Sequence, residues 1–342
     1  MKPKVFVVQP VPPEPLDLLR EHAEVEMFPH LDRRATEEEM MAGVAGADYV
    51  FALGENPMDS AMIGAAKRLE MIAVMEIFPL AIDIDAATAR GIPVTGLPHA
   101  SEITDSTAEF TFGLILATAW RIPENERLLR AGGWRQYQTR TLPTTRLRGK
   151  TLGIVGLGAI GRGVARLAAA AGMRVVYTDR GRLEAKVEAD SGAEYRDIEA
   201  LFAESDIVVL TPTLTESSKH LVGAGLLALM KPNALLINTS RGLVLDEAAL
   251  IDVLERGAIR GAGLDVYRSE FPGPRPGPDP RLFAFENVVL TPHIGTSAEE
   301  TRRWMARYVV DTMLMHMDTG ELRGLLNPEV VGRPRLSIER IG

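Results

Sequence analysis

Short apolar runs alternate with helical stretches along almost the whole chain, and this alternation restricts the possible folds more than any other feature. In the second half most runs are continuously apolar, which is typical of strands covered on both faces in a parallel sheet. Strands that alternate with helices in this way build layered, doubly wound α/β domains. The expected strands lie near residues 4–8, 48–53, 71–74, 93–95, 151–155, 174–178, 206–210, 234–238, 261–266 and 287–290.

Helical stretches separate many of these strands. They are expected near residues 15–21, 36–43, 106–130, 162–171 and 298–319. The third of them is long and apolar, yet its core, 107–120, has too few apolar residues to span a bilayer. A Pro- and Gly-rich stretch, 272–280, is expected to form a loop, and the residues after 319 a polar tail.

The composition excludes several classes of protein. A chain of 342 residues is long enough for two domains. The absence of cysteine excludes disulfides, thiolate metal sites and a cysteine nucleophile, and most histidines lack the spacing of metal ligands. The net charge of −8 argues against a nucleic-acid partner, because phosphate binding needs a concentrated basic face. The first apolar run is too short for a signal-peptide core, so we expect a cytoplasmic protein without a membrane partner.

A glycine-rich turn, Gly156-Leu157-Gly158-Ala159-Ile160-Gly161, directly follows an expected strand and opens the next helix. Its glycines permit a tight turn and let backbone N–H groups approach a pyrophosphate, which the helix N-terminus stabilises. Such a turn alone is weak evidence, because glycine-rich turns also occur in sheets that bind nothing. Here an acid follows on schedule, since Asp179 ends the next strand 18 residues after Gly161. Strand, turn, helix and acid together predict a dinucleotide site.

Asp179 also indicates which dinucleotide binds. A carboxylate at this position accepts hydrogen bonds from the adenosine ribose hydroxyls. It would repel a 2′-phosphate by about 4 kcal/mol, for like charges ~4 Å apart at an effective dielectric of ~20. We therefore expect NAD rather than NADP, with the neighbouring Arg180 as a cation that would offset part of the repulsion.

Three charged residues, Arg241, Glu270 and His293, each follow one of the last three expected strands. The carboxyl ends of parallel strands lie at one edge of a sheet, where ligands bind. Singly, each residue has a structural interpretation: a capping arginine, a solvated loop carboxylate and a loop histidine. A cation, an acid and an imidazole at the same edge as the glycine turn predict a catalytic site instead.

These motifs resemble those of the D-isomer-specific 2-hydroxyacid dehydrogenases, the family that includes D-lactate, glycerate and phosphoglycerate dehydrogenases. The resemblance extends from about residue 68 to residue 295. The motifs that carry it are DAATARGIPV (85–94), AE (108–109), GW (133–134), LRGKT (147–151), the glycine turn, NTSRG (238–242), GLDVYRSE (263–270) and TPHIG (291–295). It implies an NAD-dependent enzyme that interconverts a 2-keto acid and its D-2-hydroxy acid.

The resemblance also implies roles for single residues. Arg241 would bind the substrate carboxylate and polarise the keto oxygen. His293 would give a proton to that oxygen during reduction, and Glu270 would orient His293 and raise its pKa. Cofactor contacts are implied for Gly156, Gly158, Ala159, Ile160, Gly161, Asp179, Thr211, Thr239, Asp265 and Gly295, with Asp265 near the nicotinamide amide.

The family pattern further implies a domain organisation. A Rossmann-type NAD domain, residues 102–295, would be inserted into a smaller flavodoxin-like substrate domain made of residues 1–101 and 296–342. The apolar helix 107–120 would serve the interface of a homodimer. Trp134 matches a family tryptophan that closes over a neighbouring active site; its structural interpretation is a packing residue at a helix end.

The substrate loop departs from the family pattern. Family members present an Arg-x-Gly-x-Gly-like loop after the strand near 71–74, whereas this chain has Glu76, Ile77 and Phe78 there. Gly96 replaces a family asparagine, and the loop 99–106 looks about two residues longer than usual. A phosphorylated substrate is therefore not expected, because its usual cationic partner is missing.

Two other functions share this scaffold. Phosphite dehydrogenases have the same Arg, Glu and His, and the NAD-dependent corepressors of the superfamily use the fold as a binding module without turnover. Formate dehydrogenases are disfavoured, because they carry Gln at the position of Glu270.

Overall fold

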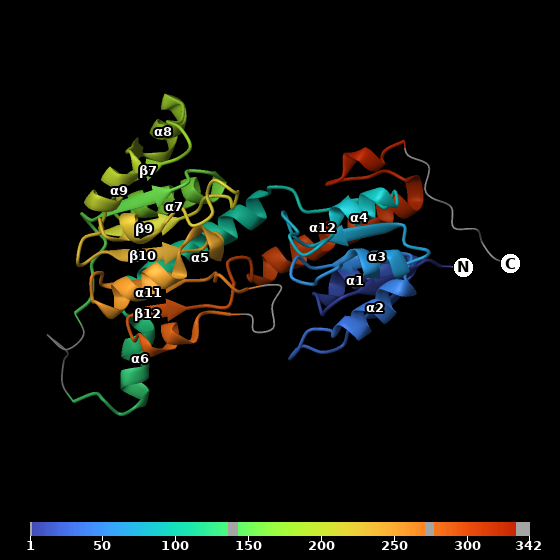
Figure 1. Cartoon of the computed structure of the whole chain (residues 1–342), viewed down its shortest axis with the longest axis horizontal. Coiled ribbons are helices and arrows are strands. Elements are labelled where there is room, and N and C mark those ends of the chain that lie inside the picture. Colours follow the sequence, from blue (N-terminus) through green and yellow to red (C-terminus); the bar gives the residue numbers. More distant parts are fainter. Residues whose placement is uncertain (1, 136–142, 271–276, 333–342) are drawn as a thin grey trace. The chain divides into compact units, whose positions relative to one another are not determined.

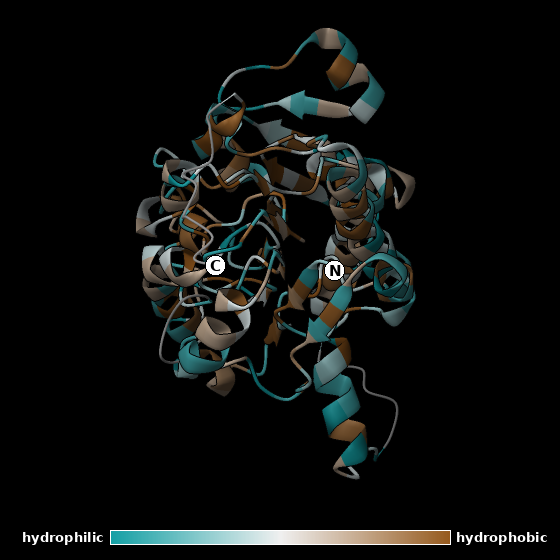
Figure 2. Cartoon of the chain, turned by 90° about the vertical axis from the view of Figure 1, so that its right-hand side faces the viewer, coloured by the Kyte–Doolittle hydropathy of each residue, from teal (hydrophilic) through white to brown (hydrophobic). Residues whose placement is uncertain are grey.

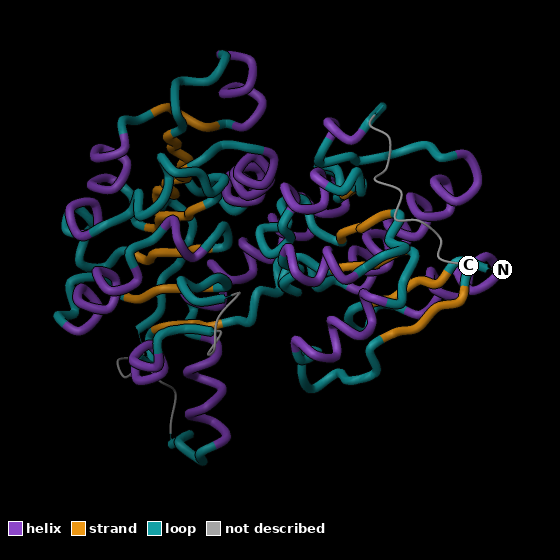
Figure 3. Tube along the Cα trace, turned by 45° about the vertical axis from the view of Figure 1, so that its right-hand side comes forward, coloured by secondary structure: helices purple, strands orange, loops and turns teal. Residues whose placement is uncertain are grey.

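The computed structural model describes residues 2–135, 143–270 and 277–332. It divides into two compact units, one of Met1–Ala100 with Glu299–Gly342 and one of Ser101–Ala298 (Figure 1). Each unit contains a parallel sheet with helices packed around it (Figure 3). The predicted α/β class with parallel sheets is confirmed.

The first unit contains a five-stranded sheet in the order β2-β1-β3-β4-β5, which is the flavodoxin-like order. Its strands are β1 (Lys4–Val7), β2 (Glu24–Met27), β3 (Tyr49–Ala52), β4 (Met71–Val74) and β5 (Val94–Thr95). Its helices are α1 (Pro13–His22), α2 (Glu37–Ala45), α3 (Ser60–Ala65), α4 (Ile84–Ala89) and α12 (Glu299–Thr319). Thr36 begins α2 with a complete capping box, and the Asp59 and Asp83 side chains cap α3 and α4.

The second unit contains a seven-stranded parallel sheet in the order β12-β11-β10-β9-β6-β7-β8. Its strands are β6 (Thr151–Val155), β7 (Arg174–Thr178), β8 (Ala193–Tyr195), β9 (Ile207–Leu210), β10 (Leu235–Asn238), β11 (Gly261–Leu264) and β12 (Val288–Leu290). Its helices are α5 (Ser101–Ala119), α6 (Ile122–Arg130), α7 (Ala159–Ala170), α8 (Ala185–Ser191), α9 (Ile198–Glu204), α10 (Ala224–Leu227) and α11 (Glu247–Glu255), with short 3₁₀ turns η1 (Gly242–Val244) and η2 (Pro280–Ala284). Successive strands are added in one direction from β6 to β8 and in the opposite direction from β9 to β12, so the order reverses between β6 and β9, the Rossmann switch point at which ligands bind.

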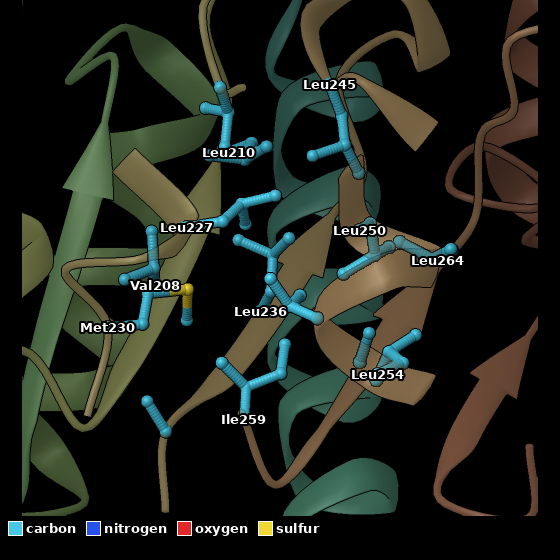
Figure 4. Packing of buried hydrophobic residues seen from close by; sticks show 14 of the residues in the cluster. Val208, Leu210, Leu227, Met230, Leu236, Leu245, Leu250, Leu254, Ile259 and Leu264 are labelled. Atoms are coloured by element: carbon cyan, nitrogen blue, oxygen red, sulfur yellow. The ribbon is translucent and has the colours of Figure 1, made fainter. Parts of the chain in front are cut away.

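Buried aliphatic side chains cover both faces of this second sheet. On one face, Val208 and Leu236 pack with Leu250 and Leu254 of α11 and with Ile259 (Figure 4). Helices α5 and α7 cover the other face. Each fully buried Leu contributes about 1.5–3 kcal/mol to folding, so the sheet is a stiff platform for the loops at its edge. In Figure 2 hydrophobic, brown segments occur on strands and alternate with hydrophilic ones along the helices.

The predicted long helix is two helices. α5 begins at Ser101, five residues before the predicted start, and ends at Ala119. Arg121 then adopts the left-handed backbone conformation (φ 52°), and Pro123 lies in the first turn of α6, so the chain turns between them. The predicted loop 99–106 is also wrong in most of its length, because residues from Ser101 onward are helical.

The described residues after α12 pair with β5, where the sequence predicted a polar tail. Leu325 forms an antiparallel bridge with Thr95. Asn327 is buried: its Oδ1 accepts the N–H of Val94 at 2.8 Å and its Nδ2 donates to the carbonyl of Ile92 at 3.0 Å. This segment therefore adds a further row of hydrogen bonds at the edge of the first sheet.

Other predicted elements differ in smaller ways. The helix predicted at 162–171 begins three residues earlier, at Ala159, and several predicted strands are one or two residues too long. The short edge strands β2 and β8 were not predicted. Of the predicted loop 272–280, residues 272–276 lie outside the described residues. Within the described ranges, the helices are all too short or too polar to cross a membrane.

Candidate active site

The glycine turn joins β6 to α7, and its three glycines meet different constraints. Gly156 has φ +91°, and a Cβ there would lie 2.8 Å from the Cα of Pro212. A Cβ at Gly161 would collide with the carbonyl oxygen of Gly156, so helix and turn pack backbone to backbone. Gly158 instead faces open space, with no atom within 4 Å of its Cβ position. Only the middle glycine therefore leaves room for a ligand.

The N-terminus of α7 has donors directed toward that space. Gly158 is its N-cap and makes no side-chain cap, and Ala159 and Ile160 are the first helical residues. The first N–H groups of a helix have no partner within the helix, and they carry the positive end of its dipole. The N-terminus of this twelve-residue helix has no side-chain cap, and the space beside Gly158 is open. Both features suit the binding of a dinucleotide pyrophosphate.

Asp179 lies at the end of β7, beside the glycine turn. Its Oδ2 accepts the N–H of Leu157 at 2.9 Å, and its Oδ1 accepts the N–H of Arg180 at 2.8 Å. The carboxylate is half-buried and the Arg180 side chain is exposed. The two backbone donors fix a negative charge next to the turn, which suits a ribose diol rather than a phosphate.

The other residues expected at the cofactor follow successive strands. Thr211 follows β9 and donates from Oγ1 to the carbonyl oxygen of Gly156 at 2.7 Å. Thr239 follows β10, and its Oγ1 lies 2.8 Å from that of Thr111 on α5. Because the sheet is parallel, these hydroxyls and the glycine turn lie at one edge of it.

Asp265, directly after β11, organises the segment that carries His293. Its Oδ1 accepts the N–H of Ile294 at 2.9 Å, and its Oδ2 accepts the N–H of Gly295 at 3.1 Å. Its carbonyl oxygen accepts the N–H of His293 at 2.9 Å. These bonds hold His293 at φ 54°, a left-handed conformation that costs a non-glycine residue about 1–2 kcal/mol. This bracing role of Asp265 was not predicted from the sequence.

His293 and Glu270 are brought together by these loops. Nδ1 of His293 lies 3.3 Å from Oε2 of Glu270, and Oε1 of Glu270 accepts the N–H of Tyr267 at 3.0 Å. Burial lowers the pKa of His293, but the hydrogen bond and charge of Glu270 outweigh it, and the pKa is raised above its ordinary value. The charge of Arg241 opposes this rise in part.

Arg241 lies between β10 and the turn η1, in an extended conformation. Its guanidinium Nη1 donates to the carbonyl oxygen of Ser240 at 2.9 Å, and its own carbonyl oxygen accepts from the side chain of Asn238. A cation, an imidazole and a carboxylate thus occupy the carboxyl edge of β10, β11 and β12. Together they can bind an anion and exchange a proton with it.

The altered loop after β4 belongs to the first unit. The Glu76 side chain is half-buried and lies over Gly54, where a Cβ would approach its Cγ to 2.7 Å. Its Oε1 accepts the N–H of Ile77 at 3.1 Å, and Phe78 is 46% exposed. Burial lowers the pKa of Arg302 on α12, while the charges of Glu55 and Glu76 raise it in part. Glu76 is thus half-buried, with its side chain against Gly54.

Comparisons with known proteins agree with this geometry. Residues 112–295 match the model of the family described as "D-isomer specific 2-hydroxyacid dehydrogenase, NAD binding domain". The chain is 38% identical over 335 residues to a glyoxylate reductase of Thermococcus kodakarensis, covering 97% of this chain and 98% of that one.

Solved structures are similar over nearly the whole chain. The TT0316 protein from Thermus thermophilus has a TM-score of 0.84 and 36% identity, covering 94% of this chain and 99% of that one. An NADPH-dependent glyoxylate/hydroxypyruvate reductase from Sinorhizobium meliloti has a TM-score of 0.81 and 30% identity, covering 97% and 100%. The chain belongs to the D-isomer-specific 2-hydroxyacid dehydrogenase family, which confirms the resemblance inferred from its motifs. It is an oxidoreductase of the keto acid/hydroxy acid class with a Rossmann-type NAD-binding domain.

Proposed function

We propose that this protein is an NAD-dependent dehydrogenase that reduces a small, non-phosphorylated 2-keto acid to its D-2-hydroxy acid, and catalyses the reverse oxidation. The observation that carries the proposal is the 3.3 Å contact between Nδ1 of His293 and Oε2 of Glu270, with the charge of Arg241 acting on the same imidazole. The bound dinucleotide supplies the hydride.

The proposed acid–base chemistry follows from which ring nitrogen is engaged. Glu270 accepts from Nδ1, so the proton on Nε2 of the charged imidazole is the one available to a keto oxygen. Arg241 binds the substrate carboxylate and polarises the keto group by drawing electron density toward the keto oxygen. During reduction His293 donates its proton to the oxygen, and during oxidation the neutral ring removes it.

The cofactor is NAD in this proposal, because Asp179 holds a fixed carboxylate where a 2′-phosphate would lie. Some relatives use the other nucleotide, as the Sinorhizobium meliloti reductase is described as NADPH-dependent. The backbone N–H groups of Leu157 and Arg180 hold the Asp179 carboxylate in place. This supports NAD, because the carboxylate would lose two hydrogen bonds if it moved aside for a 2′-phosphate.

The natural substrate is proposed to be a small 2-keto acid, because several relatives at 36–39% identity are named glyoxylate reductases. Glu76 is proposed to modify that choice. A half-buried carboxylate in the substrate loop would disfavour plain short keto acids and favour a substrate with a hydroxyl or amine in reach of it.

A homodimer is proposed from the apolar surface around α6. Trp120, Ile122, Leu129 and Trp134 are between 46% and 68% exposed, and Leu129 and Trp134 also line a hollow beside α6. Clustered exposed apolar residues mark protein interfaces. We propose that a second copy of the chain binds this surface around α6. Light scattering of the purified protein, and of a Leu129→Asp variant, tests the dimer: the wild type should have the mass of two chains and the variant of one.

A panel of NADH-oxidation assays tests the activity. It includes glyoxylate, pyruvate, hydroxypyruvate and a bulky 2-keto acid, with NAD reduction by phosphite and by formate in parallel. Reduction of a keto acid to the D-product supports the proposal. Reduction of NAD by phosphite without keto acid turnover would support the phosphite alternative, and NADH binding without turnover of any compound would support a corepressor-like module.

A further inference from the structure

A buried carboxylate, Glu247, lies at the base of the segment that carries Glu270. It is the first residue of α11 and is 9% exposed. Its Oε2 accepts the N–H of Arg268 and its Oε1 the N–H of Asp279, both at 3.3 Å. One carboxylate therefore ties together two points of the chain, one on each side of Glu270.

The two points are also joined directly. Ser269 and Gly277 form an antiparallel bridge, in which the N–H of Gly277 donates to the carbonyl oxygen of Ser269 at 2.7 Å. Glu247 adds two further hydrogen bonds next to this bridge, because its side-chain oxygens accept the N–H groups of Arg268 and Asp279.

The segment before Glu247 packs on the same loop. A Cβ at Gly242 would collide with the backbone of Tyr267 and Arg268, so η1 contacts that backbone directly. Gly242 follows Arg241, and the Asp246 side chain then caps α11 at the N–H groups of residues 248 and 249. A short, well-braced stretch of chain, 241–249, therefore carries both the substrate-binding arginine and Glu247.

Consecutive N–H groups link this stretch to the acid–base pair. The N–H of Tyr267 donates to Glu270, and the next N–H, of Arg268, donates to Glu247. A shift of Arg268 away from Glu247 would move Tyr267 and Glu270 with it. The contact between Glu270 and His293 would then lengthen, and contacts of this kind lose strength steeply with geometry.

Stability of the folded protein does not explain why a carboxylate is present at position 247. Burial raises the pKa of Glu247 more than the two backbone donors lower it, and the charge of Asp279 raises it further. An acid whose pKa is raised by folding destabilises the folded state as the pH rises above its ordinary pKa. The ionised form at neutral pH therefore costs stability, a feature typical of residues retained for activity.

We propose that Glu247 is a positioning residue for the acid–base pair: it holds the Tyr267–Glu270 segment so that Glu270 meets His293. This inference rests on the function proposed for Glu270 and His293. Glu247 does not touch the reacting atoms in this assignment. It acts through the backbone of Arg268, and the conformation it holds is the one in which Glu270 accepts from Nδ1.

Glu247→Gln tests the inference, because glutamine keeps the size of the side chain but presents an NH₂ donor to one of the two backbone N–H groups. We expect kcat to fall about tenfold, with the pKa that limits kcat shifted downward. KM for the keto acid and Kd for NADH should change less than about threefold, since neither the anion site nor the glycine turn is touched. Glu255→Gln, an exposed position on the same helix, should behave as the wild type.

A double-variant cycle separates positioning from a structural role. If Glu247 acts through Glu270, adding Glu247→Gln to Glu270→Gln should lower kcat by less than about twofold more. Losses that multiply in the double variant, or a lower unfolding temperature with an unchanged pH profile, would overturn the inference. Glu270→Gln alone tests the proposed function: if it leaves the pH profile unshifted, that function fails, whereas a shift with Glu270→Gln and none with Glu247→Gln defeats only the role of Glu247.

Discussion

Nδ1 of His293 lies 3.3 Å from Oε2 of Glu270, on a histidine held in a left-handed backbone conformation by Asp265. The strain at φ 54° is offset by backbone hydrogen bonds to the 291–295 turn, so the ring has a defined direction. With Nδ1 engaged, only Nε2 remains for substrate.

Replacing the imidazole should abolish turnover without affecting the dinucleotide. For His293→Ala we expect kcat to fall by about 10²–10⁴-fold, the usual contribution of general acid–base catalysis. NADH affinity, measured by fluorescence titration, should stay within about twofold, because the residue acts on substrate oxygen. His22→Ala, an exposed histidine of the first unit, is the control. Normal turnover by His293→Ala would refute the mechanism.

Removing the charge of Glu270 should shift the pH profile in a defined direction. The pKa of His293 is raised in the folded protein, and keto acid reduction needs the charged ring, so the rate falls as the pH rises through that pKa. Glu270→Gln should lower the pKa and move the fall to lower pH. Stability should follow the same sign, with the variant losing most stability at acidic pH, where the wild-type ring is charged. Stopped-flow rates and unfolding temperatures from pH 5 to pH 9 would measure both effects.

Asp179 should select against NADPH. The wild type should favour NADH in kcat/KM by about tenfold or more, equivalent to ~1.4 kcal/mol. Asp179→Asn keeps the shape and removes the charge, so the preference should shrink by about the same factor. Asp190→Asn, an exposed acid on α8, serves as the control. Equal kcat/KM of the wild type with NADH and NADPH would contradict this role of Asp179 and indicate that Arg180 determines the nucleotide preference.

Glu76 should influence the choice of keto acid. Its side chain lies over Gly54 and its charge acts on Arg302, so Glu76→Gly removes both bulk and charge from the substrate loop. We expect glyoxylate and pyruvate to improve about tenfold in kcat/KM relative to the preferred substrate, or ~1.4 kcal/mol. Glu76→Gln separates charge from volume. Efficient glyoxylate reduction by the wild type that is unchanged in both variants would leave Glu76 without a role in selection.

Asn327 should contribute strongly to stability although it lies in the last part of the chain. Asn327→Ala leaves the buried N–H of Val94 and carbonyl of Ile92 without their partner, which we expect to cost about 2–3 kcal/mol. Urea unfolding followed by circular dichroism would measure the loss. Asn233→Ala, at an exposed position, should change stability by less than about 0.5 kcal/mol. Equal stabilities of the two variants would show that the segment after α12 does not hold β5.

The elements that were predicted well depend on local patterns. The strand Thr151–Val155 and the strand Arg174–Thr178 were predicted with their observed bounds, because continuous apolar runs bounded by Gly or charged residues are visible within a few positions. The glycine turn and Asp179 belong to the same local pattern. The class of fold follows from such segments, and the family from the motifs at the strand ends.

Only the tertiary structure decided features that depend on distant partners. The left-handed Arg121 that separates α5 from α6, and the pairing of Leu325 with Thr95, have no local signal strong enough to predict them. Strand β2, with its alternating acids, is half-exposed at a sheet edge, so it lacks the apolar run by which the buried strands were recognised. Glu247 is the clearest case: no motif and no predicted element of the sequence singled it out. Its burial and its two hydrogen bonds arise because folding brings Arg268 and Asp279 to it, 21 and 32 residues along the chain, and no local pattern records contacts over such separations.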